Sequence, residues 1–298
     1  MEQIIKVGMV GLDTSHCPAF AGTLNNPGHE YYVAGARVVA AYAGGSAVFS
    51  LSRSRVDGFT RQIKDEFGVR LYDSIPALAN EVDAMLLESV DGRQHLEQFR
   101  QMAVGKPVYI DKPFATSSVD AQAMVELAER THTPIMSCSA LRYAAGIADL
   151  LGEGERASAD GAIRSCEAFG PAPMLEDYPG LFWYGIHSAE MLFAFMGTGC
   201  RAVRCVSYPS MDVIIGEWQD GRLGVVRGTR FEGGDFGCVV HTGQGARCGI
   251  ARSTPPYHVL LLNKVVEFFR TGVSPIDVRE TLEIVRFLEA ANENLHVH

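Results

Sequence analysis

Short, mostly apolar runs alternate with helical patterns through the first half of the chain. The runs 4–10, 36–42, 83–87, 107–110 and 134–137 predict buried strands, and helices are predicted at 18–24, 59–67, 94–104 and 117–131. Strands that alternate with helices in short units predict a parallel, doubly wound sheet with right-handed crossovers. Such sheets bind ligands beyond the carboxyl ends of their strands, which directs attention to the loops 12–16, 43–55, 88–95 and 111–114.

The pattern changes in the second half. Strands are predicted at 163–169, 203–208, 213–219, 223–229 and 238–241, and helices at 181–196, 259–270 and 278–291. Asp220-Gly221 between two of these strands is a strong hairpin signal, so the strands form an antiparallel sheet. The sequence therefore predicts an α/β protein with a Rossmann domain over 1–138 and an α+β domain over 139–298, whose final helices can pack back on the first domain.

Composition narrows the class of protein. The 298 residues are 47% hydrophobic, enough for two domains with real cores, and the net charge of −9 without a basic patch argues against a nucleic-acid partner. No apolar run reaches the roughly 18 residues of a membrane span, and the N-terminus lacks a signal-peptide layout. Seven scattered cysteines without a C-x-x-C pair indicate thiols in a reducing compartment, so we expect a cytoplasmic protein.

The loop after the first predicted strand is the first candidate for chemistry. A dinucleotide fingerprint has the form G-x-G-x-x-G, and only Gly11 is in place, because Asp13 and His16 stand at the other two glycine positions. A carboxylate near a pyrophosphate repels it, whereas Thr14 and Ser15 could cap the next helix and donate hydroxyl hydrogen bonds to a phosphate. Gly11, Asp13, Thr14, Ser15 and His16 are therefore candidates for binding the cofactor, although a capped turn that binds no nucleotide explains the same residues equally well.

The loop after the second strand is rich in small residues. NAD-specific sites usually carry Asp or Glu at the end of this strand, and none is present. Gly45 and Ser46, with Arg53 and Arg55 downstream, could accept a 2′-phosphate and so favour NADP. The alternative is a glycine loop with solvated arginines. The cofactor is therefore expected to be NAD or NADP.

Polar side chains also follow the strand 83–87 and open a helix. Buried polar groups at a strand end are costly unless they are used or solvated, so we expect them to line the site. The alternative is N-capping by Asp91 together with surface charge. The candidates are Glu88, Ser89 and His95 for the cofactor, and Asp91 and Arg93 for the substrate.

Asp111-Lys112-Pro113 follows the strand 107–110. The proline restricts Lys112 to extended geometry, which directs the lysine into the crevice at the sheet edge. A lysine near a cationic nicotinamide has a lowered pKa and can take part in proton transfer. Asp111 and Lys112 are also candidates for binding the cofactor. A surface lysine before a turn is the alternative, and the strand context favours the functional interpretation.

A helix in the second half carries His187 and Glu190 on one face. Imidazole titrates near neutral pH and suits a hydroxyl proton, although a core histidine satisfied by a backbone group is the competing interpretation. Arg142 either anchors a substrate or pairs with an acid. No metal site is indicated, because His16, His95 and His187 are far apart in the sequence.

Together these residues resemble the Gfo/Idh/MocA family, the glucose-fructose oxidoreductase and inositol dehydrogenase group. The resemblance rests on Gly11 after the first strand, on Asp111-Lys112-Pro113 and on the helix with His187. It implies a second domain with an open, mainly antiparallel sheet, and a homo-oligomer, either a dimer or a tetramer. It also implies hydride transfer between nicotinamide and a carbinol or carbonyl of a sugar, cyclitol or related polyol.

By the same resemblance, Lys112 and His187 are the catalytic residues, and His187 also contacts the substrate. Many members carry an aspartate four residues before the histidine, where this chain has Trp183, and Tyr184 beside it could donate a proton. Two alternatives stay open. One is a non-catalytic nucleotide- or ligand-binding regulatory protein on the same fold, and the other is an enzyme that uses tightly bound NAD transiently, for epimerisation, elimination or glycoside cleavage.

Overall fold

The computed structural model describes residues 3–155, 162–231 and 233–295. The chain divides into two compact units. Unit 1 contains the residues up to 115 together with 119–138 and 258–278, and unit 2 contains 116–118, 139–257 and the residues from 279 on. Each unit contains one six-stranded sheet. None of the helices in the described part of the chain is both long enough and apolar enough to cross a membrane.

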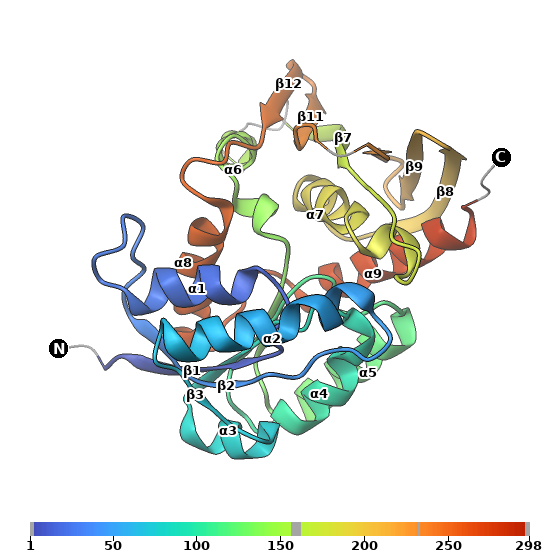
Figure 1. Ribbon diagram of the computed structural model, residues 1–298. Coiled ribbons are helices and arrows are strands. Elements are labelled where there is room, and N and C mark those ends of the chain that lie inside the picture. Colours follow the sequence, from blue (N-terminus) through green and yellow to red (C-terminus); the bar gives the residue numbers. More distant parts are fainter. Residues whose placement is uncertain (1–2, 156–161, 232, 296–298) are drawn as a thin grey trace. The chain divides into compact units, whose positions relative to one another are not determined.

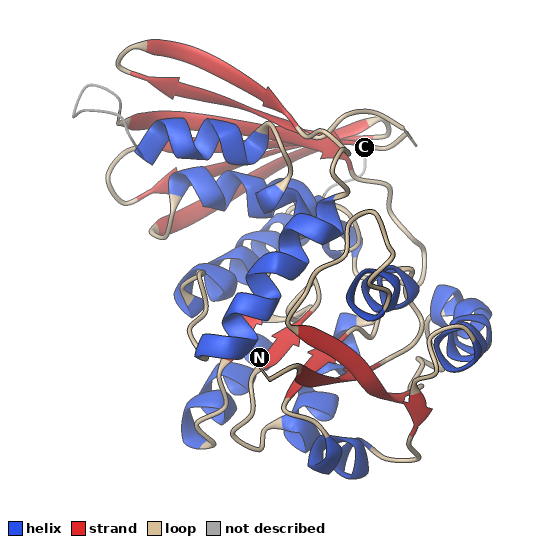
Figure 2. Ribbon diagram, turned by 90° about the vertical axis from the view of Figure 1, so that its left-hand side faces the viewer, coloured by secondary structure: helices blue, strands red, loops and turns tan. Residues whose placement is uncertain are grey.

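Unit 1 contains the parallel sheet that the sequence predicts. Its strands follow the order β3-β2-β1-β4-β5-β6, and every neighbouring pair is parallel. Figure 1 labels β1, β2 and β3 of this sheet, and Figure 2 shows strands in red. The chain order reverses between β1 and β4, and doubly wound sheets bind ligands at this switch point. The strands are β1 (Ile5–Val10), β2 (Ala36–Tyr42), β3 (Arg70–Leu71), β4 (Ala84–Leu87), β5 (Val108–Ile110) and β6 (Ile135–Ser137).

Helices connect these strands. They are α1 (His16–Asn25), α2 (Ser50–Asp65), α3 (Ile75–Glu81), α4 (His95–Met102) and α5 (Ser118–Arg130), and α8 (Tyr257–Thr271) lies almost wholly in this unit. The sequence patterns did not predict β3 or α3. Helix α2 begins earlier than predicted. Its first turns carry serines and arginines in place of an apolar stripe, so the sequence pattern does not reveal them. Only Ser52 and Ile63 of α2 are buried.

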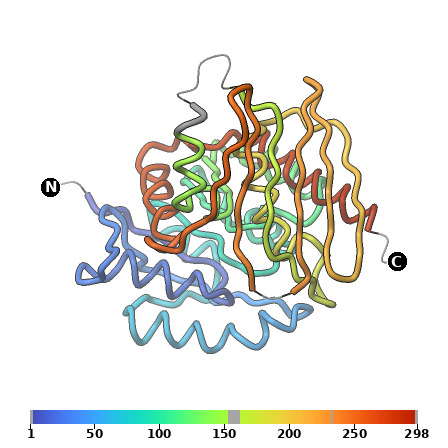
Figure 3. Tube along the Cα trace, turned by 90° about the horizontal axis from the view of Figure 1, so that it is seen from above, coloured from blue at the N-terminus to red at the C-terminus, as the bar shows by residue number. Residues whose placement is uncertain are grey.

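Unit 2 contains a mixed, mostly antiparallel sheet, as predicted. The strand order is β12-β11-β7-β10-β9-β8, and only β7 and β10 are parallel (Figure 3). Asp220-Gly221 joins β9 to β10, and Gly221 has the positive φ that this hairpin turn requires. The strands are β7 (Ile163–Pro171), β8 (Cys200–Tyr208), β9 (Met211–Trp218), β10 (Leu223–Thr229), β11 (Gly237–Thr242) and β12 (Gly245–Ile250).

The helices of unit 2 are α6 (Ile147–Glu155), α7 (Gly185–Met196) and α9 (Val278–Glu293). Helix α7 begins later than predicted, because a 3₁₀ turn over Gly180–Phe182 precedes it. The helix packs on the sheet through Phe193, whose ring lies 5.3 Å from that of Trp218 and 5.6 Å from that of Phe287 on α9. These large buried side chains hold α7 firmly in place, which fixes the start of the helix where His187 lies.

Candidate active site

The polar loops identified from the sequence follow β1, β2, β4 and β5, so they lie at the carboxyl edge of the unit 1 sheet. At the switch point, β1 leads into the turn at Gly11, where φ is +85°. A Cβ atom there would lie 2.5 Å from the backbone nitrogen of Ser89 and 2.6 Å from its Cα, so only glycine fits. Helix α1 begins at His16, and in the part of the chain that the structure describes, the Ser15 side chain does not cap it.

Asp13, at the second glycine position of the fingerprint, is fully buried and connects its own loop to the loop after β4 and to the first turn of α2. Its carboxylate accepts hydrogen bonds from the Val90 nitrogen at 2.9 Å and from Ser52 Oγ at 2.6 Å. Ser52 in turn accepts from the backbone nitrogen of Ser46 at 2.7 Å. Burial raises the pKa of Asp13 despite the hydrogen bonds from Ser52 and Val90. Sequence reasoning missed Ser52, since it lies in a segment expected to be a loop.

Asp91 and Arg93 form a bidentate pair at the start of a 3₁₀ turn. Arg93 Nε donates to Asp91 at 2.7 Å and a terminal nitrogen donates at 3.0 Å, while Ser46 Oγ donates to the same carboxylate at 2.6 Å. Burial alone would raise the pKa of Asp91, but the hydrogen bonds from Arg93 and Ser46 outweigh it and lower the pKa. Asp91 also caps the turn by accepting from the Arg93 backbone nitrogen, so the capping role that the sequence left open is present.

The loop after β2 contributes further contacts to this edge. Gly45 adopts a positive φ, and its carbonyl accepts from the Gln94 amide at 3.3 Å. Arg53, in the first turn of α2, donates to the carbonyl of Ala47 in this loop. Thus Gly45 and Ser46 hold the loops after β2 and β4 together, and Arg53 is bonded to the backbone rather than only to solvent.

His95 connects two strand-end loops. It is fully buried, and its ring nitrogens lie 2.7 Å from the carbonyl oxygen of Ser89 and 3.1 Å from that of Phe114. Both contacts are to this chain's own backbone. The geometry therefore favours a positioning role for His95 over direct contact with a cofactor, because it sets the distance between the loops after β4 and β5.

A charged cluster lies at the ends of β4 and β5. His16 Nδ1 is 2.9 Å from Asp111 Oδ2 and 3.8 Å from Glu88 Oε2, and Lys112 Nζ is 3.7 Å from Asp111 Oδ2. Burial alone would raise the pKa of Asp111, but the neighbouring His16 and Lys112 outweigh it and hold the pKa well below its usual range. Burial, reinforced by Asp111, raises the pKa of Glu88 well above its usual range. The sequence places Glu88 and Asp111 at the site but does not predict their contact with His16.

His187 occupies the first turn of α7 in unit 2. Its Nδ1 lies 2.6 Å from Ser139 Oγ, a partner that the sequence analysis did not identify. The ring packs edge-on against Tyr184 and Phe236, with centroid distances of 5.3 Å and 5.6 Å. The imidazole is only partly buried, so its ring is oriented by neighbours while part of it stays accessible.

Arg142 is buried in an acidic environment within unit 2. Its guanidinium donates to Glu190 Oε2 at 3.0 Å and also pairs with Glu280. Of the two roles that the sequence left open, pairing with an acid is therefore the one present. Glu190 shares the α7 helix with His187 but points to Arg142, and burial together with Glu280 raises the pKa of Glu190 to about 7 although Arg142 lowers it.

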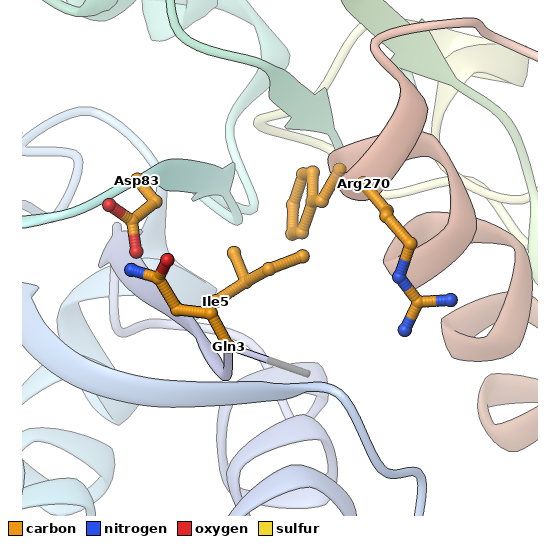
Figure 4. Close-up of a pocket in the computed structure, with 5 residues that line it drawn as sticks. Gln3, Ile5, Asp83 and Arg270 are labelled. Carbon is orange, nitrogen blue, oxygen red and sulfur yellow. The ribbon is translucent and has the colours of Figure 1, made fainter. Parts of the chain in front are cut away.

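Two surface pockets of unit 1 lie at the amino edge of the sheet. One is beside the starts of β1 and β4 and is lined by Gln3, Ile5, Asp83, Phe269 and Arg270 (Figure 4). The other lies beside the start of β6, where Pro134 and Ile135 contribute to its wall. Because doubly wound sheets bind their ligands at the carboxyl edge, neither pocket is the candidate active site.

The fold and the polar carboxyl edge define a nucleotide-binding class of protein, in which a Rossmann domain is combined with a mixed-sheet domain. Residues 5–138 match the model of the Gfo/Idh/MocA family, an oxidoreductase family with an NAD-binding Rossmann fold. This match confirms the resemblance drawn from the sequence. A search of curated protein sequences finds no significant match.

Solved structures share the fold over nearly the whole chain. A probable dehydrogenase from Thermotoga maritima is 19% identical, with a TM-score of 0.76 and coverage of 98% of this chain and 97% of the other. Myo-inositol dehydrogenase from Lactobacillus casei, in complex with NAD(H) and myo-inositol, is 16% identical, with a TM-score of 0.75 and coverage of 98% and 94%. An oxidoreductase from Agrobacterium radiobacter, in complex with NAD⁺, L-tartaric acid and magnesium, is 17% identical, with a TM-score of 0.74 and coverage of 98% and 96%.

The matched family implies NAD, and of the two departures of the first loop from the fingerprint, one is electrostatically unfavourable for this cofactor. Gly11 makes the tight turn, and the first backbone N–H groups of α1 form the kind of site that binds a phosphate. Asp13 is the unfavourable departure, because a carboxylate opposes a pyrophosphate. Both its oxygens accept hydrogen bonds from Val90 and Ser52, and burial raises its pKa, which weakens the repulsion. The donor set therefore suits a dinucleotide.

Proposed function

We propose that the protein is an NAD(P)-dependent oxidoreductase that acts on the carbinol or carbonyl of a sugar, cyclitol or related polyol. One observation carries the proposal: Asp111-Lys112 lies at the carboxyl end of β5, on the edge where Rossmann sheets bind ligands, in a domain that matches the model of an NAD-binding oxidoreductase family. The myo-inositol complex of a protein with the same fold supports the choice of a polyol as the substrate class.

Lys112 is proposed to handle the hydroxyl proton. Bound nicotinamide would supply the hydride chemistry, and the protein orients it and moves the proton. Asp111, 3.7 Å from Lys112 Nζ, holds the ammonium at the sheet edge. Gly11, Thr14 and Ser15 would hold the pyrophosphate at the start of α1.

His187 is proposed as the second proton-handling group, with Tyr184 beside it. Ser139 fixes one ring nitrogen of His187 at 2.6 Å, which orients the other nitrogen. Arg142 is not proposed as a substrate ligand, because Glu190 and Glu280 engage its guanidinium. Asp91 and Arg93 are likewise assigned to holding the loops, since they bond to each other.

The first experiment is calorimetric titration of the cofactor-stripped protein with NAD⁺, NADH, NADP⁺ and NADPH. We expect micromolar binding of one pair, followed by turnover on a panel of cyclitols and sugars. Lys112→Met should lower kcat at least about 100-fold, because general acid–base catalysis typically contributes that much. Lys64→Met, at an exposed lysine in the last turn of α2, is the matched control and should retain full activity. Absence of binding to all four nucleotides would refute the proposal.

A non-catalytic nucleotide-binding protein is the second candidate, and the buried Asp13 at a glycine position of the fingerprint favours it. The two candidates differ in one result. An oxidoreductase turns over a substrate from the panel and loses turnover with Lys112→Met. A binding protein retains nucleotide affinity, shows no turnover on any substrate, and is indifferent to that change.

A further inference from the structure

We propose that His16, Glu88 and Asp111 form a binding site for one first-row divalent metal ion of the Mn²⁺ or Zn²⁺ class. The three residues come from the start of α1 and from the ends of β4 and β5, at the switch point of the unit 1 sheet. The site does not depend on the proposed oxidoreductase activity, because its evidence lies in the geometry of three side chains.

The donor atoms converge. One imidazole nitrogen and one oxygen from each carboxylate all lie within 4.8 Å of one another. His16 Nδ1 is 2.9 Å from Asp111 Oδ2 and 3.8 Å from Glu88 Oε2. An ion bound about 2.1 Å from each ligand atom needs neighbouring donors at about 3 to 4 Å, and small adjustments of the carboxylates provide this spacing.

Glu88 supplies the second, independent observation. Its side chain is completely buried, and among the residues that the structure describes, neither carboxylate oxygen has a hydrogen-bond partner. Buried carboxylates are normally paired, hydrogen-bonded or bound to a metal, because an unsatisfied buried charge is strongly unfavourable. The oxygen of Glu88 that faces His16 is directed into the cluster, so a cation there would satisfy it.

The His16 ring is preorganised for this role. It stacks on Phe20 with the centroids 5.4 Å apart and the planes 5° from parallel, while Nδ1 faces the two carboxylates. About a quarter of the side chain is exposed (28%), which leaves a path for an ion and for water ligands. Lys112 Nζ lies 3.7 Å from Asp111 Oδ2, the oxygen that also faces His16, and Asp111 has a second oxygen to offer.

The donor set indicates the class of metal. Mg²⁺ and Ca²⁺ prefer oxygen ligands alone, and soft ions prefer thiolates, whereas one imidazole with two carboxylates suits Mn²⁺, Fe²⁺ or Zn²⁺. The nearby thiol of Cys17 donates to the carbonyl of Gly11 at 3.2 Å, so it is engaged elsewhere. Three protein ligands leave further coordination positions to water or to a ligand oxygen.

The test uses the full chain, stripped of metal with a chelator and free of nucleotide. Mn²⁺ is titrated while the electron paramagnetic resonance signal of free Mn²⁺ is recorded, and Zn²⁺ is then added as a competitor. We expect one Mn²⁺ bound per chain and its displacement by Zn²⁺. Glu88→Gln and His16→Gln should each weaken Mn²⁺ binding at least 10-fold. His29→Gln and Asp83→Asn, outside the cluster in the same unit, should leave it unchanged.

Thermal melting provides a second readout. Mn²⁺ should raise the melting temperature of the unaltered protein and of both control variants, because it binds only the folded state, and it should not raise that of Glu88→Gln. The metal-free Glu88→Gln protein should melt no lower than the metal-free parent, since glutamine keeps the shape of a side chain whose carboxyl oxygens have no hydrogen-bond partner among the described residues. If Glu88→Gln does not fold, His16→Gln carries the test, because His16 is partly exposed.

The outcomes are separate from those of the proposed function. Mn²⁺ binding that is equal in the parent and the two ligand variants, or no Mn²⁺ binding at all, would overturn the metal site. Binding of Mn²⁺ without binding of any nicotinamide nucleotide would support the site and count against the oxidoreductase. Nicotinamide-dependent turnover of a substrate by a protein that binds no metal would support the oxidoreductase and overturn the metal site.

Discussion

Replacing Glu190 with glutamine should change how the stability of unit 2 depends on pH. Burial and the neighbouring Glu280 raise the pKa of Glu190 from 4.5 to about 7, although Arg142 lowers it. The unfolded chain has the ordinary value, so between about pH 4.5 and 7 the folded protein binds more protons than the unfolded chain. Stability therefore falls as pH rises through this window. The difference, 7 minus 4.5, corresponds to a loss of about 3 kcal/mol.

Both tryptophans of the chain, Trp183 and Trp218, lie in unit 2, so their fluorescence reports the unfolding of that unit. Urea unfolding would be followed at pH 5 and pH 8. Glutamine cannot ionise but keeps an oxygen to accept from Arg142, so the Glu190→Gln protein should lose about 3 kcal/mol less than the parent between these pH values. Glu176→Gln, at an exposed position, is the control and should behave as the parent. An unchanged pH dependence in Glu190→Gln would refute the reasoning.

Two further changes test the turn and the loop network of unit 1. Gly11→Ala should cost more than about 3 kcal/mol or prevent folding, because its Cβ would collide with Ser89 at a φ of +85°, and urea unfolding followed by circular dichroism measures the loss. Ser52→Ala removes a donor to Asp13 and an acceptor for the Ser46 nitrogen, so it should cost about 1 to 3 kcal/mol by the same method. A Gly11→Ala protein as stable as the parent would contradict the account of the turn. A Ser52→Ala protein with an unchanged free energy of unfolding would contradict the hydrogen-bond network around Asp13.

Much of the unit 1 fold follows from the sequence because its signals are local. Apolar runs mark five of the six strands, and the alternation with helices fixes a parallel sheet. The same rules place the functional loops at one edge, where the structure has them. The exceptions carry weak local signals: β3 is only two residues long, Arg70–Leu71, and β12 in unit 2, Gly245–Ile250, contains two glycines and little alternation.

The partners of the site residues could not be predicted in this way. His16 and Asp111 are 95 positions apart, and Ser139 and His187 are 48 apart, so only the folded chain brings each pair together. No metal site was expected from the sequence, because His16, His95 and His187 are far apart along the chain. Carboxylates at strand ends are equally good metal ligands. Glu88 was expected at the site from its place after β4, but as a residue that binds the cofactor.

The two departures from the glycine fingerprint have related physical explanations. A glycine that is simply lost would leave an unsupported side chain in a crowded turn, but Asp13 and His16 each have partners supplied by other loops. Ser52 and the Val90 nitrogen satisfy Asp13, and Asp111 with Glu88 faces His16. Buried charges are costly unless paired, so these two side chains depend on the partners that surround them. Polar side chains at the carboxyl edge of the sheet are better suited to binding a ligand than to packing in an apolar core. Their presence favours an active site here over a purely structural turn.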